Sequence, residues 1–273
     1  MRTVLTTCLL LLACAARNQA DDPTPKSPDA RLKVQLFEPL AVEALAGNAG
    51  FFVGVGEFPN DDGVSSLSFA THDAIELAYL FSLELQLIPP KNCHLALGGE
   101  PTAEAVKGHL EQLRRAGAKI TTADRSRILL TLRQVKGIAQ DPSNLLICSF
   151  SSHGFQDRAD PYVMPSDGVR DLLAETAVPL KTIETMMQDS KAGHRLLLVD
   201  ACQERVSAKA VGDDQLGQPV PKAFQEALAV PTGQAKFASC SPGEYSFEHG
   251  SLGGVGHGVF TYEFLAALRG KAD

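Results

Sequence analysis

Two segments of the chain combine an apolar run with a side chain that can take part in covalent catalysis. His153 follows the apolar run at 144–150, and Cys202 follows a second apolar run at 195–199. The thiolate is the nucleophilic form of cysteine, and an adjacent imidazole can generate it by accepting the thiol proton. The two residues are therefore candidates for a nucleophile and its base, provided that the fold brings them together.

The segments around these residues have the pattern of an α/β protein. Continuous apolar runs, such as parallel strands covered on both faces require, alternate with stretches whose apolar residues have helical spacing. The expected strands cover residues 50–56, 93–97, 144–150, 195–199 and 236–240, and the expected helices cover residues 67–85, 102–113, 124–139, 180–187 and 259–268. Thr102 and Asp124 are candidate N-caps. The alternation predicts a right-handed, mostly parallel central sheet flanked by helices.

Such a sheet places the two candidates at one edge. Ligands of open α/β sheets bind beyond the carboxyl ends of the strands, and His153 and Cys202 are 49 residues apart with one predicted helix between them. Side chains alternate faces along a strand, so Ser151 should share a face with His153, and Asp200 with Cys202. A lone histidine or cysteine at such a position is more often structural. A charged Asp200 directly after an apolar run needs a partner or a cleft, and the combination favours the cleft.

Four motifs make the sequence resemble the caspase-like cysteine peptidases (peptidase family C14, clan CD), most closely their bacterial and metacaspase branch. These motifs are Ser-x-His-Gly at 151–154, Asp-x-Cys at 200–202, LSFATHDA at 67–74 and GHGVFTYEFL at 256–265. A histidine about 50 residues before the cysteine is a known caspase signature. The resemblance runs from about residue 50 to residue 273, and it implies the caspase-like three-layer sandwich.

The resemblance also implies roles for individual residues. Cys202 would be the nucleophile and His153 the general acid/base, and the backbone amides of Gly154 and Cys202 would form the oxyanion hole. The S1 pocket would be lined by three residues: Asp73, Ser151 and Asp200. Such chemistry needs no metal ion and no organic cofactor.

The expected pocket is acidic, which indicates a substrate with Arg or Lys before the scissile bond. Two neighbouring carboxylates repel each other, and a guanidinium or ammonium group relieves that repulsion while it forms charge-assisted hydrogen bonds. Animal caspases cut after Asp and need basic residues in this pocket, but no Arg or Lys occurs at 34–90. The alternative is that Asp200 only orients backbone donors.

The sequence departs from the metacaspases at two places. Residues 203–205 read Gln-Glu-Arg, where metacaspases commonly have His-Ser-Gly. Their calcium-binding carboxylates are not cleanly matched, because Lys209 stands about where a further acid is expected. Four acids follow His153: Asp157, Asp160, Asp167 and Asp171. They favour a solvated acidic loop over a calcium site, so no metal or cofactor is predicted, and activation by calcium is left open.

The first twenty residues have the pattern of an export signal. Arg2 precedes an apolar run at 4–16 and small residues follow, and the run is shorter than the about 20 residues that span a bilayer. Residues 11–14 (LLAC) also resemble a bacterial lipobox, in which Cys14 would carry a lipid anchor. Leu12 fits that motif poorly, so simple cleavage is favoured. We expect an exported protein, in the bacterial periplasm or secreted, with no transmembrane span.

The composition excludes several other classes. The chain has 273 residues, of which 44% are hydrophobic and 21% charged, as in a globular rather than a disordered or collagen-like protein. Its net charge of −7 argues against a nucleic-acid partner, so the expected partners are protein or peptide substrates. The cysteines beyond the signal have neither metal-binding spacing nor a disulfide framework: Cys93, Cys148, Cys202 and Cys240.

The expected organisation is a signal peptide (1–20), a flexible lead-in (21–46) and one peptidase domain (47–273). Within this domain, a large-subunit-like part (47–205) and a small-subunit-like part (236–273) are joined by a linker at about 203–235. The leading hypothesis is an exported cysteine endopeptidase that uses a Cys–His dyad and cleaves after Arg or Lys. Two alternatives stay open: a catalytically inactive caspase-like scaffold or binding module, and another hydrolase or transferase with the same pair.

Overall fold

The computed structural model describes residues 45–157, 160–204, 233–239 and 247–271, and at 202–204 it describes the backbone alone. The expected signal peptide, Cys14, Lys209 and Cys240 lie outside the described residues, as do most of the expected lead-in and linker. Within the described part of the chain, no helix is long and apolar enough to cross a membrane.

An eight-stranded, mostly parallel sheet forms the centre of the molecule. Its parallel strands lie in the order β3 (Lys119–Thr122), β2 (Cys93–Gly98), β1 (Ala49–Val55), β4 (Leu145–Asp157), β7 (His194–Glu204) and β8 (Gln234–Ala238). The carboxyl end of β4 also pairs antiparallel with β5 (Asp160–Val163), which pairs with β6 (Val178–Pro179). The prediction of a mostly parallel central sheet is therefore confirmed.

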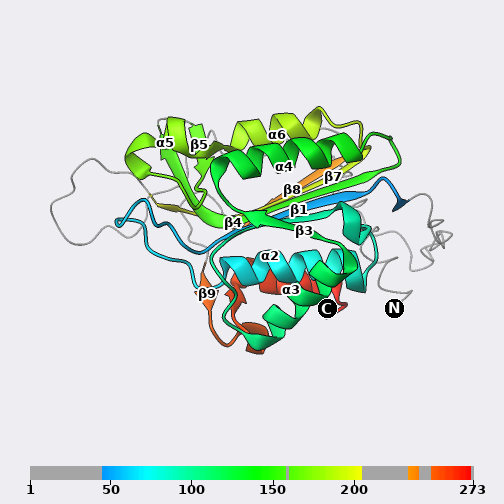
Figure 1. Ribbon diagram of the computed structural model, residues 1–273, viewed down its shortest axis with the longest axis horizontal. Coiled ribbons are helices and arrows are strands. Elements are labelled where there is room, and N and C mark those ends of the chain that lie inside the picture. The colour runs from blue at the N-terminus through cyan, green and yellow to red at the C-terminus, as the bar shows by residue number, and fades with distance from the viewer. Residues whose placement is uncertain (1–44, 158–159, 205–232, 240–246, 272–273) are drawn as a thin grey trace, which may run out of the picture.

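Helices cover both faces of this sheet (Figure 1). One layer contains α4 (Arg125–Ile138), α5 (Leu173–Thr176) and α6 (Leu180–Gln188), and the other contains α2 (Ala70–Tyr79), α3 (Glu104–Ala116) and α8 (Val259–Leu268). The shorter elements are η2 (Leu80–Glu84), η3 (Pro90–Asn92), η4 (Arg170–Leu172), η5 (Leu252–Gly254) and the pair β9 (Glu248–His249) and β10 (His257–Gly258). The result is the three-layer sandwich that the resemblance implies.

Two apolar clusters fill the space between the sheet and its helices. Side chains alternate along β1, so Phe51 and Val53 belong to the cluster under α4, whereas Phe52 belongs to the cluster under α2. All three side chains are fully buried. Burial on both faces explains why such strands have continuous apolar runs in the sequence.

The start of one helix agrees with the sequence pattern, and the start of another does not. Asp124 caps α4, because its carboxylate accepts a 2.9 Å hydrogen bond from the backbone N–H of Arg127. The prediction that Thr102 caps α3 is wrong, because Ala103 occupies the N-cap position. Thr102 instead donates its backbone N–H to Nε2 of His72 at 2.9 Å, so it binds a neighbouring helix.

The two strands that carry the candidate residues are longer than their apolar runs. β4 continues through His153 and β7 continues through Cys202, so both residues lie within strands and not beyond their ends. β4 and β7 stay paired as far as Phe155 and Glu204, so the polar residues after each apolar run still belong to the strands. The sequence does not predict β3, β5 or β6, because these short strands lack an apolar run.

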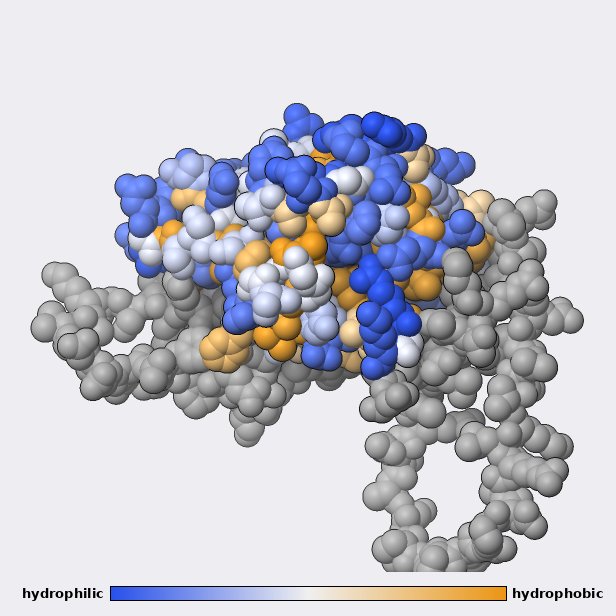
Figure 2. Space-filling model, turned by 90° about the horizontal axis from the view of Figure 1, so that it is seen from below, coloured by the Kyte–Doolittle hydropathy of each residue, from blue (hydrophilic) through white to orange (hydrophobic). Residues whose placement is uncertain are grey.

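The exposed apolar side chains are concentrated late in the chain. Among the described residues, the large exposed ones are Leu130, Leu172, Phe237, Phe247 and Val259. Three of these five lie at or beyond residue 237, within the part (236–273) that the sequence predicts to be small-subunit-like. The face seen in Figure 2 mixes hydrophobic residues with more numerous hydrophilic ones.

Candidate active site

The backbones of His153 and Cys202 are direct neighbours in the sheet. β4 and β7 run parallel, with Ser151 opposite Asp200 and His153 opposite Cys202, and Gly154 follows in β4. Neighbouring strands are about 4.8 Å apart. The sheet thus brings together, on two adjacent strands, most of the residues that the sequence singles out for chemistry.

The imidazole of His153 is held in one orientation. Its Nε2 lies 2.7 Å from the carbonyl oxygen of Ser65, which can only accept a hydrogen bond, so Nε2 carries a proton. The rings of Phe58 and Phe155 flank the imidazole at centroid distances of 5.1 and 6.0 Å. Nδ1 is buried and has no hydrogen-bond partner among the described residues. In the neutral ring, Nδ1 therefore carries the lone pair that a general base needs.

An ion pair next to Ser65 fixes the loop that carries it. The backbone N–H of Arg170 donates to Oδ2 of Asp61 at 2.7 Å, and its guanidinium lies 3.3 Å from both carboxylate oxygens. Burial raises the pKa of Asp61, but the hydrogen bonds from Arg170 outweigh this effect, so the pKa is below its usual value. Val64 donates its N–H to the carbonyl of Asp61 at 3.0 Å, and Ser65 is the next residue of the same loop.

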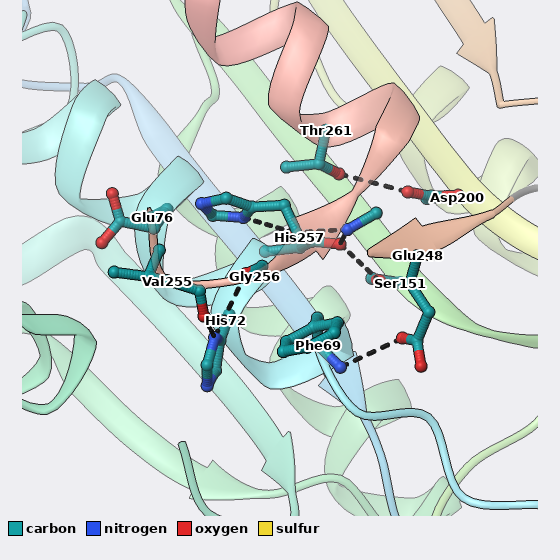
Figure 3. A network of polar contacts seen from close by, with 12 residues as sticks. Phe69, His72, Glu76, Ser151, Asp200, Glu248, Val255, Gly256, His257 and Thr261 are labelled. Atoms are coloured by element: carbon teal, nitrogen blue, oxygen red, sulfur yellow. Dashed lines mark hydrogen bonds and ion pairs between the residues drawn. The ribbon is translucent and has the colours of Figure 1, made fainter. Parts of the chain in front are cut away.

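Two buried carboxylates, those of Asp73 and Asp200, lie near the strands that carry the candidate dyad. Figure 3 shows Asp200 together with Ser151 and Thr261. Oγ of Ser151 is 3.5 Å from Oδ2 of Asp73, and the hydroxyl of Thr261 donates to Oδ2 of Asp200 at 3.2 Å. The exposed fraction is only 1% for Asp73 and 7% for Asp200. Burial and the neighbouring Asp200 raise the pKa of Asp73 well above its usual value. The structure thus brings together the three residues expected in an S1 pocket: Asp73, Ser151 and Asp200.

Two consecutive residues of the C-terminal part, His257 and Gly258, contact this acidic pair. Nδ1 of His257 lies 2.8 Å from Oδ1 of Asp73, and the N–H of Gly258 lies 3.3 and 3.2 Å from its two carboxylate oxygens. A Cβ at Gly258 would come within 2.8 Å of Oδ2 of Asp200 and 2.9 Å of Oδ2 of Asp73. Only glycine permits this approach.

The sequence predicts no role for several residues of this site. The GHGVFTYEFL motif at 256–265 contains His257, Gly258 and Thr261, and it is the signal that could have located them. Ser65 contributes a backbone carbonyl, which leaves no trace in residue type. Glu248 accepts hydrogen bonds from the backbone N–H groups of residues 68 and 69 at 2.8 and 3.1 Å and adds negative charge near Asp73.

The acids that follow His153 do not converge. Asp157 and Asp160 face each other at the end of the β4–β5 hairpin, Asp171 lies in η4, and Asp167 accepts a 2.8 Å hydrogen bond from the backbone of Arg125. In the part of the chain that the structure describes, no group of three or more His, Cys, Asp or Glu side chains is placed to hold a metal ion.

Two cysteines outside the candidate site are buried and free, Cys93 and Cys148. Burial raises the pKa of Cys93 to about 12 and raises the pKa of Cys148 further. Neither thiol forms appreciable thiolate at neutral pH, so neither is a competing nucleophile.

Comparisons with known proteins agree with the motifs. The family model for the caspase domain (Peptidase C14) matches residues 51–273. Among solved structures, caspase-1 from Spodoptera frugiperda matches with a TM-score of 0.40 and 11% identity, over 74% of this chain and 62% of that chain. A protein from Geobacter sulfurreducens matches with a TM-score of 0.37 and 12% identity, over 57% of this chain and 50% of that chain. No curated protein matches.

The two solved structures are longer than the matched region, and this chain spans about half to three fifths of their lengths. The family match is more extensive, because it begins in β1 and includes both His153 and Cys202. The chain therefore belongs to the caspase-domain family, whose members are cysteine peptidases.

Proposed function

We propose that this protein is a cysteine endopeptidase that hydrolyses peptide bonds through Cys202 and His153. The observation that carries the proposal is the orientation of His153 in the strand next to Cys202. Because Nε2 is bound to the carbonyl of Ser65, Nδ1 keeps its lone pair, and the residue directly opposite in register is Cys202. Membership of the caspase-domain family supports the same chemistry.

In the proposed reaction, Nδ1 of His153 accepts the thiol proton of Cys202, and the thiolate attacks the carbonyl carbon of the scissile bond. The backbone N–H groups of Gly154 and Cys202 stabilise the oxyanion. The C–N bond then breaks, His153 gives the proton to the departing amine, and a thioester remains. A water molecule, deprotonated by His153, attacks the thioester and releases the carboxylic acid and the thiol. Water is the only co-substrate.

We further propose that the residue before the scissile bond is Arg or Lys. The support is the pair Asp73 and Asp200, which is buried beside the candidate nucleophile and has a third acid, Glu248, nearby. A guanidinium or ammonium group would neutralise these carboxylates and form charge-assisted hydrogen bonds with them. Uncharged side chains would leave the repulsion in place.

Export is also a proposal, which rests on the sequence pattern of residues 1–20. Expression of the full chain in bacteria, followed by fractionation and N-terminal sequencing, tests it. The expected product is found in the periplasm or the medium and lacks residues 1–20. A cytoplasmic product that retains these residues would contradict it.

Labelling with a peptidyl-arginine chloromethyl ketone tests the catalytic proposal. The expected result is one covalent adduct, which mass spectrometry locates on Cys202 and which is absent from the Cys202→Ala variant. Cys93 and Cys148 serve as internal controls, because their raised pKa values keep them unreactive. A matched peptidyl-aspartate reagent should label more slowly. A folded protein that forms no adduct, or forms it elsewhere, would favour the inactive scaffold.

A further inference from the structure

The first turn of α2 binds four consecutive residues from the C-terminal part of the chain (Figure 3). Nδ1 of His72 lies 3.1 and 3.2 Å from the carbonyl oxygens of residues 255 and 256. The next residue, Asp73, contacts His257 and Gly258. His72 therefore binds only backbone groups of this segment, whereas Asp73 binds the side chain of His257 and the backbone N–H of Gly258.

The contact between His257 and Asp73 determines which carboxylate oxygen faces the acidic pocket. Oδ1 of Asp73 is occupied by Nδ1 of His257 at 2.8 Å. Oδ2 of Asp73 lies 3.5 Å from Oγ of Ser151. It also faces Gly258, on whose other side lies Oδ2 of Asp200. An ionised carboxylate can only accept hydrogen bonds, so the imidazole donates its Nδ1–H.

The surroundings of His257 favour the neutral ring. Burial lowers the pKa of His257, Glu76 on α2 acts in the opposite direction, and Arg269 at the C-cap of α8 lowers the pKa further. The ring of Tyr262 lies 6.3 Å away, and only 3% of His257 is exposed. A neutral imidazole still has one N–H, and Asp73 receives it here.

We propose that His257 is a positioning residue for substrate binding, because its Nδ1–H holds Oδ1 of Asp73 and directs Oδ2 toward the basic side chain of the substrate. This inference rests on the proposed function. Among the described atoms, the side-chain hydrogen bond of His257 goes to Asp73, so His257 acts through that carboxylate. It should therefore affect the binding of basic substrates, and it should leave the reactivity of Cys202 unchanged.

Steady-state kinetics of three variants on an Arg peptide provide the first test. His257→Leu removes the donor, and KM should rise at least tenfold while kcat stays within about twofold. His257→Asn retains an N–H at the position of Nδ1 and should restore KM to within threefold of wild type. His249→Gln is the matched control, because His249 is exposed and pairs with His257 in the same small sheet. The kinetics of this control should match those of wild type. In every variant, the rate at which iodoacetamide alkylates Cys202 should also equal the wild-type rate.

The inference is overturned if His257→Leu leaves KM unchanged, or if His257→Asn is as impaired as His257→Leu. Addition of His257→Leu to an Asp73→Asn variant should raise KM by less than twofold. An undiminished effect in that background would show that His257 does not act through Asp73, and it would equally overturn the inference.

Two measurements need no turnover, so they separate this inference from the peptidase proposal. Agmatine carries a guanidinium but no peptide bond, and calorimetry should show at least tenfold weaker binding to His257→Leu than to wild type. Equal binding, or no binding to wild type, would contradict the inference even if peptides are cleaved. In wild-type protein, ¹⁵N NMR of labelled histidine should show His257 protonated on Nδ1 and not on Nε2. The opposite tautomer would overturn the inference even if His257→Leu fails to fold.

Discussion

Asp73 and Asp200 approach each other across the backbone of Gly258. A methyl group at Gly258 would lie within 2.9 Å of a carboxylate oxygen of each residue, so no side chain larger than hydrogen fits at position 258. Both aspartates are buried, and repulsion between them adds to the effect of burial in raising the pKa of Asp73. Either a proton on one of the acids or a cation bound next to the pair can relieve this repulsion, and protonation removes charge that would attract the cation.

This effect of protonation predicts that acid weakens the binding of Arg peptides. Because the pKa of Asp73 is raised well above its usual value, Asp73 takes up a proton at a higher pH than an exposed aspartate does. A neutral Asp73 attracts a guanidinium less, so kcat/KM for an Arg peptide should fall as the pH falls through the raised pKa. The other titratable groups around Asp73 are Asp200, Glu248 and His257. The measurement is a pH profile of kcat/KM, compared with the profile of a peptide with a neutral residue at the same position. Identical profiles would contradict the prediction.

Gly258→Ala should damage the acidic pocket. The added methyl group would press on two hydrogen-bonded carboxylates, Asp73 held by His257 and Gly258 and Asp200 held by Thr261, so one of them must move. We expect kcat/KM for the Arg peptide to fall at least tenfold. Gly108→Ala is the control, because Gly108 lies in α3 with open space around the position of its Cβ. That change should raise the free energy of unfolding by about 0.5 to 1 kcal/mol and leave kinetics unchanged. A Gly258→Ala variant with wild-type kinetics would contradict the prediction, because it would show that the two carboxylates tolerate a methyl group at position 258.

Cys202→Ala and His153→Ala should each lower peptide hydrolysis by roughly 10³-fold or more, because each removes one of the two groups that make the proposed thiolate. Neither should change the circular dichroism spectrum. Cys148→Ala is the matched control, since Cys148 is a buried thiol in the same strand as His153. It should cost stability but retain kcat. Turnover close to wild type in either dyad variant would rule out the proposed mechanism.

Arg170→Met should lower kcat more than it raises KM. The substitution keeps an unbranched apolar stem and the backbone N–H that binds Asp61, but it removes the two guanidinium donors to that carboxylate. Asp61 lies in the loop whose Ser65 carbonyl orients His153. We expect kcat to fall about tenfold, with KM within twofold of wild type. Arg115→Met is the control, because Arg115 is exposed on α3. A rise in KM with unchanged kcat would indicate that the ion pair serves substrate binding instead.

The folded state should lose stability as the pH falls from about 6.5 toward 4. His94 is buried in β2, and burial together with Lys119 lowers its pKa to about 4. An unfolded chain has histidines with an ordinary pKa of about 6.5, so over this range it binds a proton that the folded chain does not, and acid favours unfolding. Urea unfolding of His94→Leu at pH 7.5 and 4.5 should show about 2 to 3 kcal/mol less loss between the two pH values than wild type. The exposed His249→Gln should behave like wild type, and an equal loss in all three proteins would refute the assignment to His94.

The sequence predicts those parts of this molecule that depend on local pattern. Continuous apolar runs identify β1, β4 and β7. Strand alternation predicts that Ser151 lies on the same face as His153, and Asp200 on the same face as Cys202. The contributions of Ser65 and Gly258 are different in kind, because one is a backbone carbonyl and the other is the absence of a side chain. Thr102 has the residue type of a helix cap, but Ala103 is the N-cap of α3, and the backbone N–H of Thr102 donates to Nε2 of His72 on another helix. Contacts of this sort are determined only by tertiary packing.

The contacts of Asp73 with residues 184 and 185 positions later have a consequence for the order of assembly. The dyad strands can pair as soon as β7 has been synthesised, but the acidic pocket also needs β10 and the start of α8, which follow β7 in the chain. Contacts between such distant residues form slowly, because a long loop must close first. During synthesis, a growing chain would therefore hold its candidate nucleophile and base before it could select a substrate.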